Sequence, residues 1–400
     1  MGIQNIHQIA PPFLPIYAAI TYGGIERVMY SLDGALTRLG YHTSMSATEG
    51  SKPIGTLYPT TAFPITLLEG SGKLLDSRLR CDATLLERMR NGTVPQNEDA
   101  FPFSTTPYYL RLEHIATALE HANRGTFDVI HCHDENMFPF ASVVNKPMVF
   151  TIHSPPNEYY DPRFHPRLFS KDLHICAVSN RIRTLFNERG WNVKYVVHNG
   201  FDIDKKYFSD EKIGYFLSLG IITPRKGHHL AIEVAQKLGK NLVISGNLDP
   251  ENLQYFEEQI KPHVTDFIEG EQDKLFFVSR VPVDSGRIIY TGSVNDQQKF
   301  PLFQHADAFL VFSAFEDPFP GVVIEAMACG TPVVGWRKGG IPEMIEQGFN
   351  GYVVQSVQEA ISHIKNLRIS PSDCRQHYEE EFTSERMAEN YLKVYETIQP

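Results

Sequence analysis

Short apolar runs with strand character alternate with helical patterns along almost the whole chain. Such alternation predicts an α/β protein in which parallel strands are joined by crossover helices. The runs fall into two series, which predicts two Rossmann-like domains. The first series comprises residues 3–9, 129–132, 148–152, 175–178 and 195–197. The second comprises residues 215–220, 241–245, 287–291, 308–312 and 332–335.

A chain of 400 residues is long enough for two domains of ordinary size. The boundary is expected at residues 198–202, where a strand ends in the turn-forming stretch HNGFD. This gives an N-terminal domain over 1–200, a C-terminal domain over 201–377 and a final segment over 378–400. That last segment reads as one long amphipathic helix, from about 378 to 398. Its apolar face is formed by Met387, Tyr391, Val394 and Tyr395.

The charge and cysteine content exclude several classes of protein. A net charge of −10, from 37 basic and 47 acidic residues, argues against a nucleic-acid partner. Five scattered cysteines without a CxxC pair make a disulfide framework or structural zinc improbable. No signal peptide or membrane-spanning run is visible, so a cytoplasmic protein is expected.

A less regular insertion separates the early strands. Residues 67–90 read as a helix rich in Leu and Arg, followed by a loop over 91–107. Residues 73–90 carry five cations and three acids, which is typical of an ordinary amphipathic surface helix. Peripheral contact with an anionic membrane is the alternative.

The first motif with chemical content is YGGIER, residues 22–27, at the start of a predicted helix. Gly23 and Gly24 would let backbone N–H groups approach a phosphate, which the helix dipole also favours. A tight turn with positive φ explains the same glycines equally well, because short glycine motifs often match by chance.

The second motif is residues 313–330, SAFEDPFPGVVIEAMACG, in which an acidic Pro/Gly loop joins a strand to a short helix. Amides of this loop can hold a diphosphate, and Glu325 can accept hydrogen bonds from ribose hydroxyls. Asp317 would face the sugar. Acids at a helix start are also common for structural reasons, but this does not explain Glu325 within a small, apolar helix.

The third motif is residues 220–227, GIITPRKG, between a strand and the helix expected over 228–238. Lys226 at the helix start can neutralise a leaving diphosphate. A solvated basic turn is the more common reading of such a lysine taken alone.

These motifs in this order resemble glycosyltransferase family 4, whose members have the two-domain GT-B fold and retain anomeric configuration. The resemblance covers nearly the whole chain and is strongest over 216–354. Residues 316–334 match the family's E-x(7)-E pattern, in which Asp317 takes the place of the first acid. The APPFLP and YGGIERV segments resemble a bacterial subgroup that includes antibiotic and polysaccharide glycosyltransferases.

The resemblance implies a role for each motif. The N-terminal domain would bind the acceptor and the C-terminal domain the nucleotide sugar, and the final helix would return to the N-terminal domain. His153, Lys226, Asp317 and Glu325 would be catalytic. Donor-binding residues would be Gly23, Gly24, Arg225, Glu316, Phe319, Pro320, Gly321 and Val322, and acceptor-side candidates His133 and Glu26.

No cofactor or metal is expected, since His131 and His133 lack a carboxylate at metal-ligand spacing. UDP-glucose is the donor expected from family frequency and GDP-mannose the next. The acceptor would be a glycan, a lipid-linked molecule or a small molecule.

One departure from the family concerns the strand before Lys226. The family usually carries Arg directly after the strand's glycine, whereas this chain has Ile221. Arg gives phosphate a bidentate grip that Ile cannot provide. Either the diphosphate is held differently or catalysis is weakened. A catalytically idle GT-B binding protein is therefore the alternative function. An NAD-dependent oxidoreductase is disfavoured, because the G-x-G-x-x-G fingerprint is missing.

Overall fold

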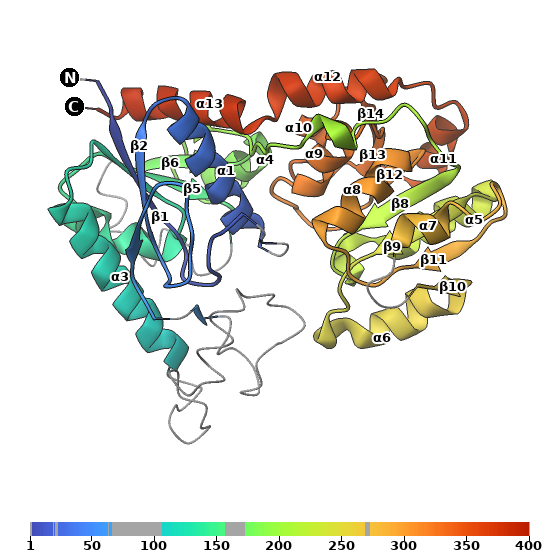
Figure 1. Ribbon diagram of the computed structural model, residues 1–400, viewed down its shortest axis with the longest axis horizontal. Coiled ribbons are helices and arrows are strands. Elements are labelled where there is room, and N and C mark those ends of the chain that lie inside the picture. Colours follow the sequence, from blue (N-terminus) through green and yellow to red (C-terminus); the bar gives the residue numbers. More distant parts are fainter. Residues whose placement is uncertain are drawn as a thin grey trace. The chain divides into compact units, whose positions relative to one another are not determined.

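The computed structural model describes residues 2–18, 20, 23–62, 64–65, 106–156, 173–268 and 273–399. The chain divides into two compact units, each with a sheet of its own (Figure 1). The first contains Met1–Val178, Arg183–Phe201 and Ser384–Pro400, and the second contains Ser179–Ile182 and Asp202–Thr383. Each unit is built on a parallel sheet with helical connections, which confirms the α/β class with two Rossmann-like domains.

The sheet of the first unit has the order β3-β2-β1-β4-β5-β6-β7 in the described part of the chain. Its neighbouring strands pair in parallel, with Ile6 of β1 opposite both Thr43 of β2 and Val129 of β4. The strands are β1 (Asn5–Ile9), β2 (His42–Ala47), β3 (Thr56–Pro59), β4 (Val129–Cys132), β5 (Met148–Ile152), β6 (His174–Ala177) and β7 (Tyr195–Val196).

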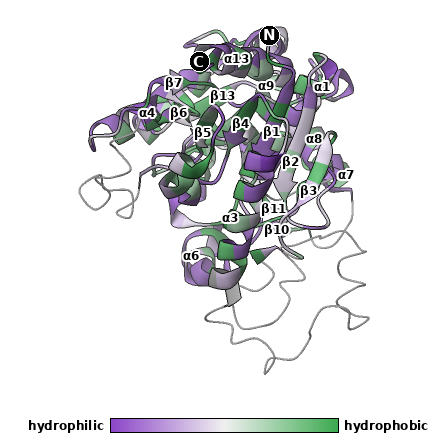
Figure 2. Cartoon of the chain, turned by 90° about the vertical axis from the view of Figure 1, so that its left-hand side faces the viewer, coloured by the Kyte–Doolittle hydropathy of each residue, from purple (hydrophilic) through white to green (hydrophobic). Residues whose placement is uncertain are grey.

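Helices accompany this sheet. Val28, Leu32 and Leu36 form the buried stripe of α1 (Gly24–Arg38), whereas Leu39 lies beyond the end of the helix and is exposed. Figure 2 faces this unit and shows the hydrophobic colour gathered in the central strands β4 and β5. The helices are α1 (Gly24–Arg38), α3 (Thr106–Arg124), α4 (Asn180–Asn187, whose first three residues belong to the second unit) and α13 (Ser384–Thr397).

The sheet of the second unit has the order β10-β11-β9-β8-β12-β13-β14. Its strands are β8 (Tyr215–Leu219), β9 (Asn241–Ser245), β10 (Asp266–Phe267), β11 (Ile288–Tyr290), β12 (Ala308–Val311), β13 (Val333–Trp336) and β14 (Gly351–Val354). Its helices are α5 (His228–Leu238), α6 (Leu253–Tyr255), α7 (Lys274–Val278), α8 (Asp296–His305), α9 (Gly321–Ala328), α10 (Ile341–Met344), α11 (Val357–Lys365) and α12 (Pro371–Glu381).

In both sheets the order of the strands reverses direction at one interior strand. In the first unit β1 lies between β2 and β4, and in the second β8 lies between β9 and β12. At such a switch point the loops that leave two neighbouring strands diverge, and ligands of open α/β sheets bind outside the carboxyl ends of those strands. The fold therefore favours binding sites after β1 and β4, and after β8 and β12.

Some strands that complete the sheets were not predicted from the sequence. The longest is β2, whose sequence HTSMSA has no continuous apolar run. Its two serines are nevertheless buried, because Ser44 and Ser46 hydrogen-bond to the ring nitrogens of His7 on β1 at 2.8 and 2.9 Å. Polar groups can occupy core positions when they are hydrogen-bonded. A strand built from such residues has no apolar run, so hydropathy does not predict it.

The single helix expected over 378–398 is wrong, because the structure has two helices here. α12 ends at Glu381 and α13 begins at Ser384. The helix breaks where Phe382, with φ −126° and ψ 22°, leaves helical geometry and buries its ring. α13 belongs to the first unit and buries the four expected side chains, Met387, Tyr391, Val394 and Tyr395.

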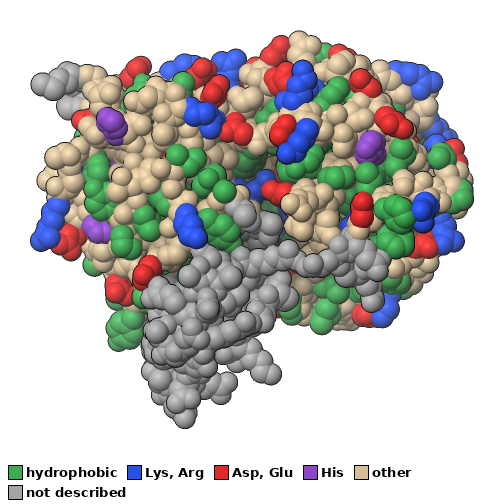
Figure 3. Space-filling model, viewed as in Figure 1, with side chains coloured by type: hydrophobic (Ala, Val, Ile, Leu, Met, Phe, Trp, Pro, Cys, Tyr) green, Lys and Arg blue, Asp and Glu red, His purple; other side chains and the backbone are tan. Residues whose placement is uncertain are grey.

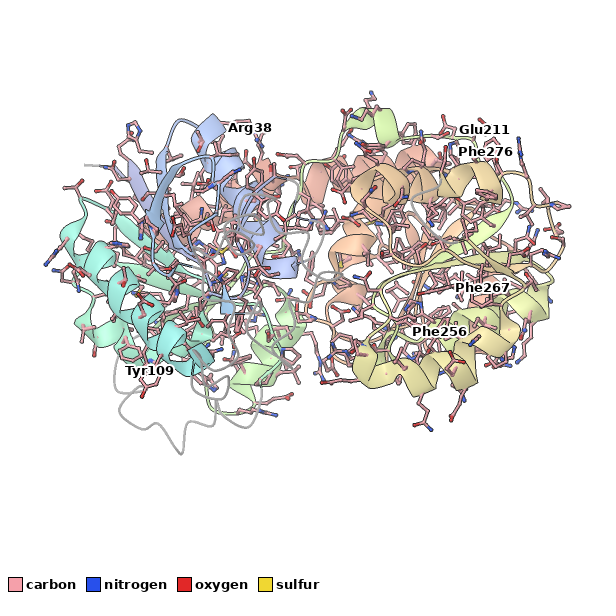
Figure 4. All side chains as sticks on the ribbon, turned by 60° about the horizontal axis from the view of Figure 1, so that its bottom comes forward. Arg38, Tyr109, Glu211, Phe256, Phe267 and Phe276 are labelled. Carbon is pink, nitrogen blue, oxygen red and sulfur yellow. The ribbon has the colours of Figure 1, made fainter. Side chains whose placement is uncertain are left out.

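The helix expected over 67–90 and the loop over 91–107 lie outside the described residues, apart from the first two residues of α3. Within the described ranges, no helix combines the length and apolar character needed to cross a bilayer. Charged side chains of both signs are scattered over the visible face (Figure 3). Large apolar side chains on the outside include Tyr109 on α3, and Phe267 and Phe276 in the second unit (Figure 4).

Candidate active site

The central site of the second unit is formed by the two loops that follow β8 and β12. The β8 loop turns through Pro224–Lys226, a short 3-10 helix, into α5 at Gly227. Gly227 has φ 72°, and a Cβ there would lie 2.1 Å from the carbonyl oxygen of Phe312 at the end of β12. Only glycine lets the two loops approach this closely. The backbone N–H of Ala314 then donates to the carbonyl of Arg225 at 2.7 Å.

Lys226 and Asp317 meet where these loops touch. The Lys226 Nζ lies 2.7 Å from Asp317 Oδ2, and the Ser313 hydroxyl donates to the same oxygen at 3.3 Å. The ring of Phe315 lies beneath two cations, 5.2 Å from the guanidinium of Arg225 and 5.1 Å from Lys226 Nζ. Asp317 is nearly buried while Lys226 keeps a partly exposed side chain. A cation fixed at this edge of the sheet can neutralise a diphosphate.

Two glycines hold the backbone of Asp317 in place. The Gly340 N–H donates to the Asp317 carbonyl at 2.8 Å. Gly339 has φ 58°, and a Cβ at this position would lie 2.0 Å from the same carbonyl oxygen. Gly339 and Gly340 therefore act as a backbone support for the acid.

Glu316, expected to share the donor sugar with Asp317, is engaged by protein groups. Arg181 donates to both of its carboxylate oxygens, from Nε at 3.0 Å and from the terminal nitrogen at 2.9 Å. The Gly339 N–H donates to the same carboxylate at 2.9 Å. The hydrogen bonds from Arg181 lower the pKa of Glu316. The sequence did not reveal Arg181, which lies 135 residues away and outside every motif.

Glu325 lies on α9, the helix that follows the acidic loop. Its side chain is completely buried, and the ammonium of Lys299 on α8 lies 2.8 Å from its Oε1. Helical side chains point back towards the N-terminus of their helix. Glu325 is therefore directed at the turn that contains Gly321 and Val322, both of which are partly exposed.

The remaining expected donor residues line the start of α9. Phe319 is buried and its ring lies 5.8 Å from that of Phe382, which fixes the loop from below. Pro320 is the N-cap of α9 and Gly321 its first residue. The first N–H groups of a helix have no partner within it, so they can bind a phosphate.

The central site of the first unit follows β1, β4 and β5. Gly23 precedes α1 with φ 116°, and a Cβ there would lie 2.5 Å from Glu26 Oε2, whereas Gly24 has open space around it. Gly23 therefore has a structural reason to be glycine. Burial of Glu26 raises its pKa to about 7.

Two of the expected histidines form a pair. His133 follows β4, His153 follows β5, and their Nδ1 and Nε2 atoms lie 2.9 Å apart. Burial holds the pKa of His133 far below its ordinary value and lowers that of His153 to about 3. Both rings are therefore neutral at physiological pH.

The pair has an identifiable tautomer. Nε2 of His133 is buried and has no hydrogen-bond partner among the described residues. A buried N–H without an acceptor costs more than a buried lone pair. We therefore assign the proton of His133 to Nδ1, from which it donates to Nε2 of His153. His153 then carries its own proton on Nδ1.

A second hydrogen-bond network, centred on His131, was not predicted from the sequence. Nδ1 of His131 lies 2.7 Å from the hydroxyl of Tyr395, and Nε2 lies 2.7 Å from that of Thr151. Thr151 is in turn 3.0 Å from the Tyr391 hydroxyl. His131 has both nitrogens in use and is buried, so its role is to join α13 to β4 and β5. Within the described ranges, no cluster of three or more His, Cys, Asp and Glu side chains could hold a metal ion.

Comparisons with known proteins identify the class to which the chain belongs. Residues 201–381 match the family described as Glycosyl transferases group 1, and residues 22–205 match Glycosyltransferase Family 4. The fold and these two matches define the chain as a glycosyltransferase of the GT-B fold. The matches cover residues 22–381 between them, and each falls on one sheet-bearing half of the chain.

Individual relatives are distant. The putative glycosyltransferase YtcC of Bacillus subtilis is 25% identical over 347 residues, 73% of this chain and 78% of that protein. Spore coat protein SA of the same organism is 33% identical, but over 105 residues, which span 24% of this chain and 28% of its own length. Among solved structures, Anabaena Alr3699/HepE in complex with UDP-glucose is similar with a TM-score of 0.62 and 15% identity. That match covers 98% of this chain and 99% of the other.

Proposed function

We propose that this glycosyltransferase moves a hexose from a nucleoside-diphosphate sugar to an acceptor hydroxyl, with retention of configuration and without a metal ion. The observation that carries the proposal is the Lys226–Asp317 pair at the switch point of the second sheet, 2.7 Å between charged atoms. The N-terminus of α9 and the buried Glu325 follow directly in the chain. Together they offer groups for a diphosphate, a sugar and a ribose.

Each group has a part in the proposed reaction. The bond between the anomeric carbon and the diphosphate oxygen breaks, and the acceptor oxygen bonds to that carbon from the same face. The leaving diphosphate takes the acceptor's proton. Lys226 and the first N–H groups of α9 stabilise the charge that develops on the diphosphate. Asp317 holds a sugar hydroxyl and Glu325 the ribose, so that positioning supplies much of the rate.

His153 is proposed to act at the reacting sugar. With its proton on Nδ1, the neutral ring can donate a hydrogen bond to a sugar hydroxyl or to a leaving oxygen. His133 and Glu26 in the same unit are proposed on the acceptor side. Because the HepE structure contains UDP-glucose, we propose this donor first. The acceptor is proposed to be a glycan, a lipid-linked molecule or a small molecule, as in polysaccharide biosynthesis.

The test is release of free nucleoside diphosphate from UDP-, GDP-, ADP- and dTDP-sugars without added metal. Wild type is compared with Glu325→Ala and with the matched control Glu257→Ala, whose carboxylate is exposed and pairs with Lys261. Slow release from one sugar by wild type and the control, and loss in Glu325→Ala, is expected. A strict requirement for a divalent cation would contradict metal independence.

A catalytically idle binding protein is the second candidate, favoured by Ile221 in place of the family arginine. It predicts thermal stabilisation by one nucleotide sugar with no release from any. Reverting Ile221 to Arg would then be the change that tests whether activity returns.

A further inference from the structure

Lys299 is a buried lysine that no motif singled out. Its side chain is 8% exposed on α8 and its ammonium lies between two carboxylates, 2.8 Å from Glu325 Oε1 and 2.7 Å from Asp296 Oδ1. Asp296 is 41% exposed whereas Glu325 is fully buried, so the two contacts differ in kind. The pair with Glu325 joins two helices through residues that lie 26 positions apart in the chain.

The position of Lys299 is fixed by its surroundings. α8 begins in a capping box in which Asn295 and Gln298 hydrogen-bond to each other's backbone N–H. The ammonium lies 4.9 Å from the centre of the Phe300 ring, which stacks on Tyr207 at 4.5 Å. The lysine therefore has few alternative conformations, and its charge is held against Glu325.

A buried carboxylate needs such a partner. Without a nearby cation, burial favours the protonated acid, because an unpaired charge is costly away from water. A protonated acid has lost part of its capacity to accept hydrogen bonds. An ionised carboxylate can accept about four hydrogen bonds, so an acid that is paired with Lys299 can also accept from a ligand. A cation 2.8 Å from Oε1 favours the charged form of such a buried acid and fixes the orientation of Glu325.

We propose that Lys299 is a positioning residue that sets recognition of the donor's ribose through Glu325. The inference rests on the proposed function, in which Glu325 accepts hydrogen bonds from the ribose hydroxyls. Lys299 itself touches no substrate. Removal of its charge is expected to weaken binding of ribonucleotides and to leave nucleotides without ribose hydroxyls unaffected. Lys299 therefore determines the preference for a ribonucleotide donor.

The experiment measures the Kd of UDP and of 2′,3′-dideoxyuridine diphosphate by titration calorimetry on the full chain. Should the sugar panel select another base, the corresponding pair is used. Wild type is expected to prefer UDP by about ten-fold or more, since hydrogen bonds to a charged group are strong. Lys299→Gln is expected to lose this preference without a change for the dideoxy probe. Lys299→Arg, which keeps the charge, is expected to restore it.

Matched controls separate this role from a general effect on folding. Lys237→Gln removes an exposed lysine that pairs with Glu233, and it is expected to keep the wild-type preference. The double variant Lys299→Gln/Glu325→Gln removes both charges and serves if Lys299→Gln does not fold. Its preference is expected to equal that of Glu325→Gln alone, because the lysine acts only through the acid.

Two results would overturn the inference. One is an unchanged ribose preference in a folded Lys299→Gln. The other is an equal loss for both probes, which would indicate a merely structural lysine. If wild type binds no nucleoside diphosphate at all, the proposed function fails and this inference fails with it. If wild type binds UDP and Lys299→Gln keeps the same preference for UDP over the dideoxy probe, only this inference is refuted and the proposed function stands.

Discussion

Lys226 and Asp317 lie 91 residues apart in the chain and form an ion pair of 2.7 Å at the carboxyl edge of the second sheet. The Ser313 hydroxyl donates to the same aspartate oxygen. In the proposed reaction the ammonium of Lys226 pairs with the incoming diphosphate instead of with Asp317. The Asp317 carboxylate can then accept a hydrogen bond from the sugar. The pair therefore keeps both groups in place before the donor arrives.

Lys226→Ala is expected to lower kcat by about 10²–10³-fold, the range found when one electrostatic group at a developing charge is removed. Lys226→Arg is expected to recover part of the loss. The rate of nucleoside diphosphate release with the selected sugar measures the effect. Lys237→Ala is the control on an exposed lysine. A kcat unchanged in Lys226→Ala would exclude the lysine from stabilisation of the leaving group.

His133→Ala is expected to lower kcat about ten-fold or more while the KM for the donor stays nearly constant, because the fixed tautomer of His153 is lost. The ¹⁵N NMR shifts of His153 check the cause directly. They are expected to show the proton on Nδ1 in wild type and a mixture of tautomers in the variant. A wild-type His153 protonated on Nε2 would refute the assignment.

Ile221→Arg is expected to tighten binding of the nucleoside diphosphate up to about ten-fold, since the guanidinium can hold phosphate bidentately. The backbone at this position is already fixed, because the Ile221 carbonyl lies 3.2 Å from Nε2 of the buried His228. Ile221→Lys supplies a positive charge without the bidentate geometry of a guanidinium, so it should increase the affinity for the nucleoside diphosphate by a smaller factor. Titration calorimetry decides, and equal affinity in all three proteins would show that the site has no room for an added cation.

Gly339→Ala is expected to reduce both stability and activity, because the new Cβ would lie 2.0 Å from the Asp317 carbonyl oxygen. Gly348→Ala is a matched control, since Gly348 also has positive φ, 82°, but open space around it. In this control the free energy of unfolding should fall only by the cost of placing alanine in a positive-φ backbone conformation, about 1 kcal/mol. Thermal unfolding and nucleotide release are measured on both, and equal effects would show that contact with Asp317 is unimportant.

The first unit is expected to be sensitive to acid. Burial lowers the pKa of His7 to about 3 and that of His114 to about 4, and it also lowers those of His131 and His133. The unfolded chain binds these protons near pH 6.5 and the folded chain does not. Stability is therefore complete above about pH 6.5 and falls as the pH drops towards the folded pKa values.

Each such histidine should cost about 1.4 kcal/mol of unfolding free energy at pH 5.5. Urea unfolding between pH 8 and 5 measures the loss. His7→Gln should reduce the slope of the free energy of unfolding against pH by the contribution of one proton. This reduction is expected whatever the effect of the substitution on stability at pH 8. A pH-independent free energy of unfolding would contradict the neutral, buried state of these rings.

Local patterns were sufficient for the strands with apolar runs and for the helices α1 and α5, because the core dictates their hydrophobic spacing. They failed for β2, where hydrogen bonds between Ser44, Ser46 and His7 replace apolar burial. They failed also for Lys299 and Arg181, whose partners Glu325 and Glu316 lie far along the chain. A charge that is buried only through a distant partner leaves no mark on the residues around it.

The position of α13 has a consequence for the order in which the protein can be assembled during synthesis. The hydroxyls of Tyr391 and Tyr395 bond to Thr151 and His131 in the sheet of the first unit. That unit therefore lacks part of its interior until Ser384–Pro400 have been made, long after its strands. Apart from Ser179–Ile182, the second unit is continuous over Asp202–Thr383 and is complete earlier. The half that is translated first is the half that matures last.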